Sequence, residues 1–246
     1  MKHRILVWAL GLLVSVPAFS QTIETDRPDQ TEAATLVPVG GFQLETGVSG
    51  WTSGDGMVTG YTLPTALARY GLHRRFELRI VGQRDQSQYN FIDLTPPWQS
   101  SSAWDVGAKF AGWNTDASQM CVLAHYQHRP DGNDGGQVRA NWAKSLGRRF
   151  SVGTNLGLTW FWATEDEAVV GQMLYTLALG CAVTESLYAY VEAFGAGGGL
   201  QADAGLAWKP NPTSQLDASV GWTDGSGQSY VAVGWSKLWM TGRSGR

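Results

Sequence analysis

The chain has 246 residues, a length that fits one ordinary domain or one medium-sized barrel. Its 18 basic and 21 acidic residues become 16 and 21 once Lys2 and Arg4 are removed with the leader described next, so the mature chain has a net charge of −5 with histidines neutral. This acidic balance argues against nucleic acid as a partner. The 31 glycines and 12 tryptophans are high numbers for a soluble domain, but tight barrel packing and interfacial aromatic girdles use both residue types.

Residues 1–20 have the three parts of a secretory signal peptide. The basic start KHR precedes an apolar run over residues 5–16, and Ala18 and Ser20 place small side chains at the −3 and −1 positions of a cleavage site. No later stretch stays apolar for the roughly 18 residues that a membrane helix needs. We therefore expect residues 1–20 to be removed.

Residues 21–40 are polar, contain two prolines and show no sustained period, which indicates an arm before the first strand. Residues 41–239 then alternate apolar and polar side chains in runs of about ten, the length of a tilted membrane strand. The clearest unit comes last, where Leu216, Val220 and Trp222 share one face and the turn sequence TDGSGQ follows. The pattern predicts strands at residues 42–49, 61–70, 76–84, 103–113, 119–128, 137–146, 150–162, 172–183, 187–195, 200–208, 215–222 and 231–239.

The predicted strands are even in number, and the breaks between them tend to alternate long and short, as in bacterial outer-membrane barrels. The longest break covers residues 86–101, and the inner turn KPNPT is slightly long for its position. These features predict an all-β fold: a transmembrane antiparallel up-and-down β-barrel of about 12 strands, followed by a tail at residues 240–246. A soluble sandwich or lipocalin-like barrel is the alternative, and it would turn its apolar faces inward.

If the apolar faces contact lipid, the opposite faces line the lumen, where charged groups avoid the cost of about 2–4 kcal/mol for Arg or Lys at the bilayer midplane. The lumen-lining candidates are Glu45, Arg69, Glu77, Arg79, Asp105, Lys109, Arg139, Asn155, Glu192, Asp203 and Asp217. These side chains either select solutes in an open pore or pair across the lumen and fill it. Twelve strands lie between the small filled barrels and the wide porins, so both possibilities remain.

The polar arm carries four charged residues close together: Glu24, Asp26, Arg27 and Asp29. This cluster could fold into the lumen as a plug or gate, with its carboxylates meeting Arg69 or Arg79. The alternative is a solvated periplasmic tail.

Several blocks resemble a family of exported proteins named for the meta-pathway of phenol degradation. They are IETDRPDQTE, VPVGGFQLETG, LPTALARYGL with RFELRIVG, WDVGAKF, YTLALGCAVTESLYAYVEAFG and LDASVGW. The resemblance covers most of the mature chain and implies an outer-membrane barrel that passes small molecules, with aromatic ones as candidates. It defines no catalytic residues. One departure is the end of the chain, because barrel proteins usually stop on an aromatic residue and here MTGRSGR follows Trp239.

The sequence also leaves two other functions open. A lipid-modifying enzyme of the outer membrane would need a nucleophile, a base and an orienting group, but the chain has no G-x-S-x-G block. His125 and His128 lie three apart on one strand and therefore face opposite ways, and neither histidine nor Cys121 or Cys181 has the spacing of a metal site. A structural or adhesive barrel would instead present the break at residues 86–101, which contains Tyr89, Phe91 and Trp98.

The sequence thus predicts a passive channel or transporter for small, including aromatic or hydrophobic, molecules in the outer membrane of a Gram-negative bacterium. Its expected partners are outer-membrane lipid, the barrel-insertion machinery and a small-molecule solute. No catalytic residue, metal or cofactor is expected. The sequence leaves the oligomeric state open and does not say whether the two cysteines pair.

Overall fold

The computed structural model describes residues 22–28, 30–90, 96–130, 134–162, 170–223 and 227–241. The expected signal peptide and Asp29 lie outside the described residues. The chain forms twelve strands: β1 (Gly41–Thr52), β2 (Val58–His73), β3 (Phe76–Tyr89), β4 (Gln99–Asn114), β5 (Ser118–His128), β6 (Gly135–Leu146), β7 (Phe150–Phe161), β8 (Val170–Ala182), β9 (Leu187–Ala196), β10 (Gln201–Asn211), β11 (Ser214–Thr223) and β12 (Ser229–Met240).

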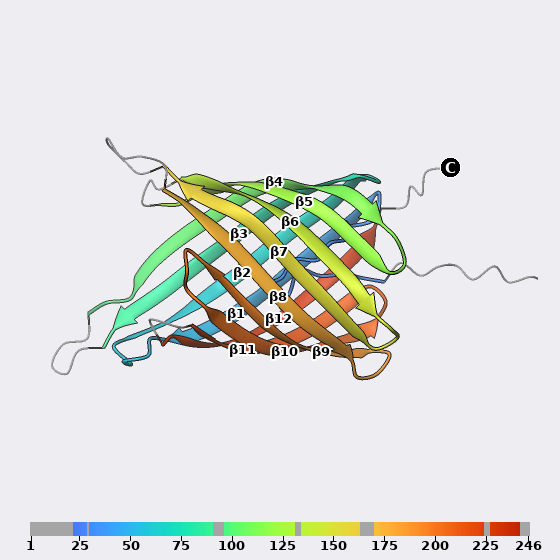
Figure 1. Ribbon diagram of the computed structural model, residues 1–246. Helices are drawn as coiled ribbons and strands as arrows, with labels where there is room; N and C mark the ends of the chain where they lie inside the picture. The colour runs from blue at the N-terminus through green and yellow to red at the C-terminus, as the bar shows by residue number, and fades with distance from the viewer. Residues whose placement is uncertain are drawn as a thin grey trace, which may run out of the picture.

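Each strand pairs antiparallel with its neighbours in sequence, and β1 pairs with β12 to close the barrel (Figure 1). The closing ladder is continuous from Gly41 opposite Met240 to Thr52 opposite Ser229. The predicted twelve-stranded up-and-down barrel is therefore confirmed. Closure matters physically because it leaves no unpaired strand edge in hydrocarbon.

Many strands extend a few residues beyond their predicted bounds; β2, for example, runs over Val58–His73 instead of residues 61–70. β3 continues to Tyr89 and β4 begins at Gln99, so both ends of the break expected at residues 86–101 are strand. The sequences there, QSQY and QSS, are polar on both faces and carry no apolar period. The turn in KPNPT is tight, because β10 ends at Asn211 and β11 begins at Ser214, and β12 runs one residue past the predicted barrel end, to Met240.

The first and last strands bring the start of β1 and the end of β12 to the same end of the barrel. The connections at that end are short, at residues 74–75, 115–117, 147–149, 183–186 and 212–213, whereas those at the other end are mostly longer, from four residues at 197–200 up to nine at 90–98. Bacterial barrels keep their short turns in the periplasm. We therefore call this end the periplasmic end.

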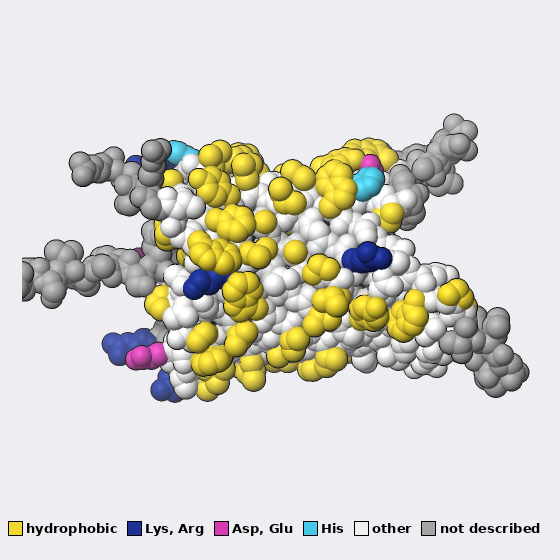
Figure 2. Space-filling model, turned by 180° about the vertical axis from the view of Figure 1, so that it is seen from behind, with side chains coloured by type: hydrophobic (Ala, Val, Ile, Leu, Met, Phe, Trp, Pro, Cys, Tyr) yellow, Lys and Arg dark blue, Asp and Glu magenta, His cyan; other side chains and the backbone are white. Residues whose placement is uncertain are grey.

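The outer face of the wall is apolar. Leu156, Phe150 and Val231 are each 58% exposed, and hydrophobic side chains spread over the barrel between its two ends (Figure 2). Eight tryptophans are also exposed: Trp98, Trp104, Trp113, Trp162, Trp208, Trp222, Trp235 and Trp239. Among the described residues no helix could span a membrane. An exposed apolar belt of this extent needs lipid around it.

The inner face is polar. The largest fully buried side chains include Arg69, Arg79 and Lys109, whereas the apolar cluster of the described interior consists of Ile23, Val37 and Leu238. This distribution is the reverse of a soluble barrel, where the apolar faces would fill the centre. The sandwich and lipocalin-like alternatives are therefore excluded.

Arg84 and Lys237 nevertheless lie on the outer face. Arg84 donates from Nε to Ser100 Oγ (3.1 Å) in the part of β3 that extends toward the outer rim. Lys237 lies near the periplasmic end of β12, and its Nζ donates to Thr213 Oγ1 and Ser214 Oγ, both at 2.9 Å. Both positions let a long side chain reach polar partners away from the hydrocarbon centre.

Candidate functional site

Residues 22–40, called the arm below, enter the barrel and leave it at the periplasmic end. Ile23 N donates to Pro212 O in the β10–β11 turn (2.6 Å), and Gly40 N donates to Gly71 O on β2 (2.8 Å). A Cβ at Gly71 would lie 2.1 Å from Pro38 O, so the returning arm can approach β2 this closely only over a glycine. Between these two anchors the arm loops into the lumen.

The arm touches the whole circumference of the lumen. It makes hydrogen bonds, ion pairs or apolar contacts with every strand, through Glu45 (β1), Arg69 (β2), Arg79 (β3), Lys109 (β4), Cys121 (β5), Arg139 (β6), Asn155 (β7), Thr176 (β8), Glu192 (β9), Lys209 (β10), Asp217 (β11) and Leu238 (β12). A segment bonded to all sides of the wall crosses the path along the barrel axis.

Asp26 is the centre of these contacts. Its carboxylate accepts hydrogen bonds from Arg79 Nη1 (2.5 Å) and Lys109 Nζ (2.9 Å), and Arg69 Nη1 lies 3.4 Å away. Ala33 N donates to the same carboxylate (2.8 Å), which folds the arm back on itself. Burial disfavours the charged form, but the three cations outweigh it and hold the pKa of Asp26 well below its usual range.

The wall beside Asp26 contains its own carboxylates. Arg69 Nε donates to Glu77 Oε1 (2.8 Å) and Arg69 Nη1 donates to Glu45 Oε1 (3.0 Å). The arm supplies a second carboxylate, Glu32, which lies 3.0 Å from Arg79 Nη2. Glu32 also lies 3.5 Å from Lys109 and 3.9 Å from Arg139. The basic wall is thus formed by β2, β3, β4 and β6.

The opposite wall, on β9, β10 and β11, is acidic. Arg27 Nη2 approaches Asp217 Oδ1 at 3.4 Å, and a Cβ at Gly47 or Gly234 would lie within 2.6 Å of the Arg27 guanidinium. Glycine at these two positions therefore makes room for Arg27. The charge of Asp26 therefore pairs with the basic wall and that of the next residue, Arg27, with Asp217, while Arg27 Nη1 also donates to Thr65 Oγ1 on β2 (3.1 Å).

The same wall holds the next part of the arm. Gln30 N donates to Glu192 Oε2 (2.7 Å) and Thr31 Oγ1 donates to the same carboxylate. Asp203 accepts from Tyr230 OH (2.6 Å) and does not contact the arm in the described hydrogen bonds. The lumen therefore has one positive and one negative side, with the arm between them.

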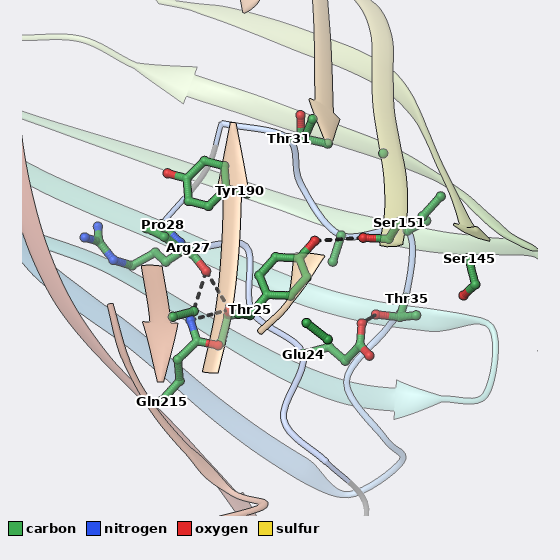
Figure 3. A pocket seen from close by; sticks show the side chains of 18 of the residues that line it. Glu24, Thr25, Arg27, Pro28, Thr31, Thr35, Ser145, Ser151, Tyr190 and Gln215 are labelled. Atoms are coloured by element: carbon green, nitrogen blue, oxygen red, sulfur yellow. Dashed lines mark hydrogen bonds between the residues drawn. The ribbon is translucent and has the colours of Figure 1, made fainter. Parts of the chain in front are cut away.

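A cavity of about 420 Å³ lies between the arm and the strands β5 to β11 at the periplasmic end (Figure 3). Glu24, Thr25 and Arg27 of the arm form one side, and Ser145 and Ser151 of the wall lie on the other. Because the arm is one wall of this cavity, a displacement of the arm would join the cavity to the rest of the lumen.

Some of the predicted site residues form contacts between the arm and the wall, and others do not. All eleven lumen candidates lie on the inner face, but Asp105 is bonded to Arg129 (2.7 Å) away from the arm. Of the arm candidates, Asp26 and Arg27 meet the wall with their side chains, whereas the carboxylate of Glu24 is exposed and accepts from Thr35 Oγ1 (3.3 Å). Asp29 is outside the described residues.

Several residues of the site were missed from the sequence. Glu32 lies in the same polar block as Asp26 and could have been included for its charge alone. Gln43 and Gln215 donate to backbone carbonyls of the arm, at Glu24 (2.8 Å) and Arg27 (3.0 Å). Both glutamines have the inward parity of Glu45 and Asp217, and parity was the signal that could have identified them.

The groups considered for an enzyme do not form a hydrogen-bonded set within the described residues. His125 lies on the inner face and its Nδ1 is 3.0 Å from Gln137 Nε2, while His128 is on the outer face. Ser118 accepts from Trp142 and Ser151 bonds Tyr188, at 3.0 and 2.8 Å. Both cysteines are free, and no metal-binding group occurs among the residues described. In the break considered for adhesion, Trp98 packs on Tyr61 with ring centroids 5.4 Å apart, and Phe91 lies outside the described part.

A closed antiparallel barrel with an apolar outer belt, a charged lumen and short turns beside both termini is an outer-membrane β-barrel with a porin-like fold. The amino-acid sequence places the chain in a particular family within this class. The chain belongs to the family described as "Putative MetA-pathway of phenol degradation", whose profile matches residues 25–236. The resemblance seen in the sequence is thereby confirmed.

Solved structures with the same fold include outer-membrane channels. The COG4313 outer membrane channel from Pseudomonas putida F1 is 11% identical with a TM-score of 0.63, and the match covers 86% of this chain and 99% of that chain. The KdgM porin in complex with disordered oligogalacturonate is 10% identical with a TM-score of 0.57, covering 78% and 98%. The NanC porin is 7% identical with a TM-score of 0.56, covering 78% and 98%. No curated protein matches the chain.

Proposed function

We propose that the protein is a passive channel of the outer membrane for small solutes, and that the arm is its gate. The single observation that carries this proposal is the contact of one short segment with all twelve strands. A filled small barrel has no need of a separate segment to occupy its centre, because wall side chains can do so. Here the lumen is wide enough to hold a loop of backbone, and removing that loop leaves a passage.

The nature of the arm contacts supports gating over permanent closure. The described arm is held mainly by ion pairs and hydrogen bonds to wall side chains, with the small apolar cluster of Ile23, Val37 and Leu238 at its periplasmic base. When the arm leaves, its charged and polar groups and those of the wall can be hydrated or can bind other ions, whereas a large apolar core exposed to water would have no such replacement partners. Both ends of the arm are attached at the periplasmic end of the barrel, so the arm would leave the lumen toward the periplasm.

The solute is proposed to be small, and aromatic compounds are included because the family description refers to phenol degradation. No energy source is needed for diffusion through such a lumen. The channel is proposed to act after export of the chain with a cleaved signal peptide, and the lumen-lining residues named above would set its selectivity.

Deletion of residues 23–30 tests the proposal. In planar lipid bilayers the deleted protein should show a larger single-channel conductance than the full-length protein, and heat-modifiable migration in gel electrophoresis should show that both are folded. An equal conductance of two folded proteins would reject the gate and favour a closed structural or adhesive barrel. Phospholipid hydrolysis by the pure protein in detergent would instead favour an enzyme.

A further inference from the structure

Lys109 has an unusual set of partners. Its side chain is fully buried, and within the described residues every one of its polar contacts goes to the arm. Nζ donates to both carboxylate oxygens of Asp26 (2.9 and 3.0 Å) and to Ala33 O (2.9 Å), and Glu32 Oε2 lies 3.5 Å away. A buried ammonium that loses all its partners is strongly disfavoured. When the arm leaves, another anion has to take its place or water has to enter.

The net charge of the basic wall shows how many negative charges a bound group must carry to neutralise it. Four cations, Arg69, Arg79, Lys109 and Arg139, face two wall carboxylates, Glu45 and Glu77, so the wall alone has an excess of two positive charges. The arm supplies two negative charges there, on Asp26 and Glu32. The arm therefore occupies this wall in the way that a solute with two carboxylates would.

The donors are arranged for carboxylates. Arg79 uses Nη1 for Asp26 and Nη2 for Glu32, so one guanidinium already binds two separate carboxylates. Nε of Arg79 and Nε of Arg139 make no hydrogen bond with the described residues, which leaves further donors for a ligand. Glu192, Asp203 and Asp217 on the acidic side repel anions, so a solute with two negative charges would be confined to the basic side.

The location is reachable from an existing space. Glu32 and Ala33, which contact Lys109, also line the cavity at the periplasmic end. Figure 3 shows the neighbouring arm residues Thr31 and Thr35 beside this cavity. A solute in this cavity is therefore adjacent to Glu32, one of the two arm carboxylates that it would replace.

We propose that Arg69, Arg79, Lys109 and Arg139 form a carboxylate-binding site of the permeation path, occupied by Asp26 and Glu32 in the closed state and by a small dicarboxylate in the open state. The inference rests on the proposed function and deepens it by naming a solute class. Because arm and solute use the same donors, they exclude each other, and the solute shifts the population toward the undocked arm.

Arm release can be measured without any current. Cys121 is buried on the inner face beneath Ala33 O, 3.8 Å from its Sγ, so a small water-soluble thiol reagent should reach it only when the arm has left. Cys181 lies among the lipid-facing residues of β8 and is removed with Cys181→Ala. The full-length C181A protein is reconstituted and treated with the thiol reagent in the presence of one of three additions. These are succinate, its neutral isostere succinamide, and sodium chloride at the same ionic strength as the succinate.

At ten times its dissociation constant, succinate should raise the labelling rate of Cys121 about elevenfold, and succinamide and sodium chloride should not. Lys109→Gln should raise the labelling rate without succinate, because the arm also loses a partner, and at the same succinate concentration it should reduce the elevenfold increase to about twofold, because the lost charge-assisted hydrogen bond raises the succinate dissociation constant about tenfold. Arg129→Gln, which removes a cation paired with Asp105 away from the arm, should leave the succinate response unchanged. If Lys109→Gln does not fold, the comparison of succinate with succinamide decides.

Equal labelling with succinate and succinamide would overturn the site. Inorganic phosphate acting at the same concentrations as succinate would overturn its assignment to carboxylates. A failure of the proposed function looks different: succinate would accelerate labelling while neither succinate nor arm deletion raised the conductance. Conversely, if arm deletion raised the conductance but succinate had no effect on labelling, the proposed channel function would stand and the carboxylate-binding site would be rejected.

Discussion

The substitution Asp26→Asn isolates the ion pairs that hold the arm. It keeps the size of the side chain and an oxygen that can accept from Ala33 N, but it removes the charge that Arg79, Lys109 and Arg69 face at 2.5, 2.9 and 3.4 Å. The substitution leaves those three buried cations with one carboxylate fewer. We therefore expect the arm to dock more weakly in the variant.

The magnitude follows from burial. Both partners are almost inaccessible, with the Asp26 side chain 3% and the Arg79 side chain 1% exposed. Removing one member of a buried ion pair costs about 3–5 kcal/mol. At about 1.36 kcal/mol per factor of ten, the ratio of undocked to docked arm should rise by about 150-fold to about 5,000-fold.

The assay is the fraction of time that single channels spend in their high-conductance state, supported by the rate of Cys121 labelling. Glu24→Gln is the matched control, because it makes the same charge change on the same arm at an exposed carboxylate that contacts Thr35 Oγ1 at 3.3 Å. The control should change the ratio less than about fivefold. If Asp26→Asn and Glu24→Gln gave the same open fraction, the idea that the basic wall holds the arm would be refuted.

Two further substitutions test the base of the arm and the outer face of the wall. Ile23→Ala removes a fully buried side chain from the cluster with Val37 and Leu238 and should weaken arm docking by about 2–5 kcal/mol, seen as faster Cys121 labelling, whereas Val39→Ala, at a 43% exposed position, should have little effect. Equal labelling in both variants would exclude an apolar anchor. Leu156→Arg places a cation in the middle of β7 on the lipid face and should lower the free energy of unfolding in bilayers by about 2–4 kcal/mol. The control Leu146→Arg, at the periplasmic end of β6, should lower it by about 0–1 kcal/mol. Urea titration measures both values. A larger loss at Leu146 would contradict the assigned membrane level.

The barrel was predictable because each crossing strand carries its own signal. Leu216, Val220 and Trp222 alternate with polar partners in the sequence, and that alternation alone gives the strand and its lipid face. The far ends of β3 and β4 were not predictable in this way. They extend beyond the apolar region, so nothing selects apolar residues on one side, and a two-sided polar strand looks like a loop.

The site was predictable in composition and only partly in pairing, since the arm carboxylates were expected near Arg69 or Arg79 but not near Lys109. Inward parity placed Arg79 and Lys109 on one face of their strands, and the polar block of the arm drew attention to Asp26. The contact between Asp26 and Lys109 joins residues 83 positions apart and depends on the closed register of the whole barrel. An aperiodic segment such as the arm also gives no signal of where it docks, which is why Glu32 was missed although its partners Arg79, Lys109 and Arg139 were lumen candidates.

The central claim is that the arm inside the barrel keeps the channel closed, and a reversible cross-link tests it most directly. Ala33→Cys in the C181A background places a second thiol beside the native Cys121, whose Sγ lies 3.8 Å from Ala33 O. Under oxidising conditions the arm should be fixed to β5, and high-conductance openings should disappear and return on reduction in the same bilayer. The same substitution in a chain that also carries Cys121→Ala should not respond to oxidation. Unchanged openings in the fully cross-linked protein would contradict the account.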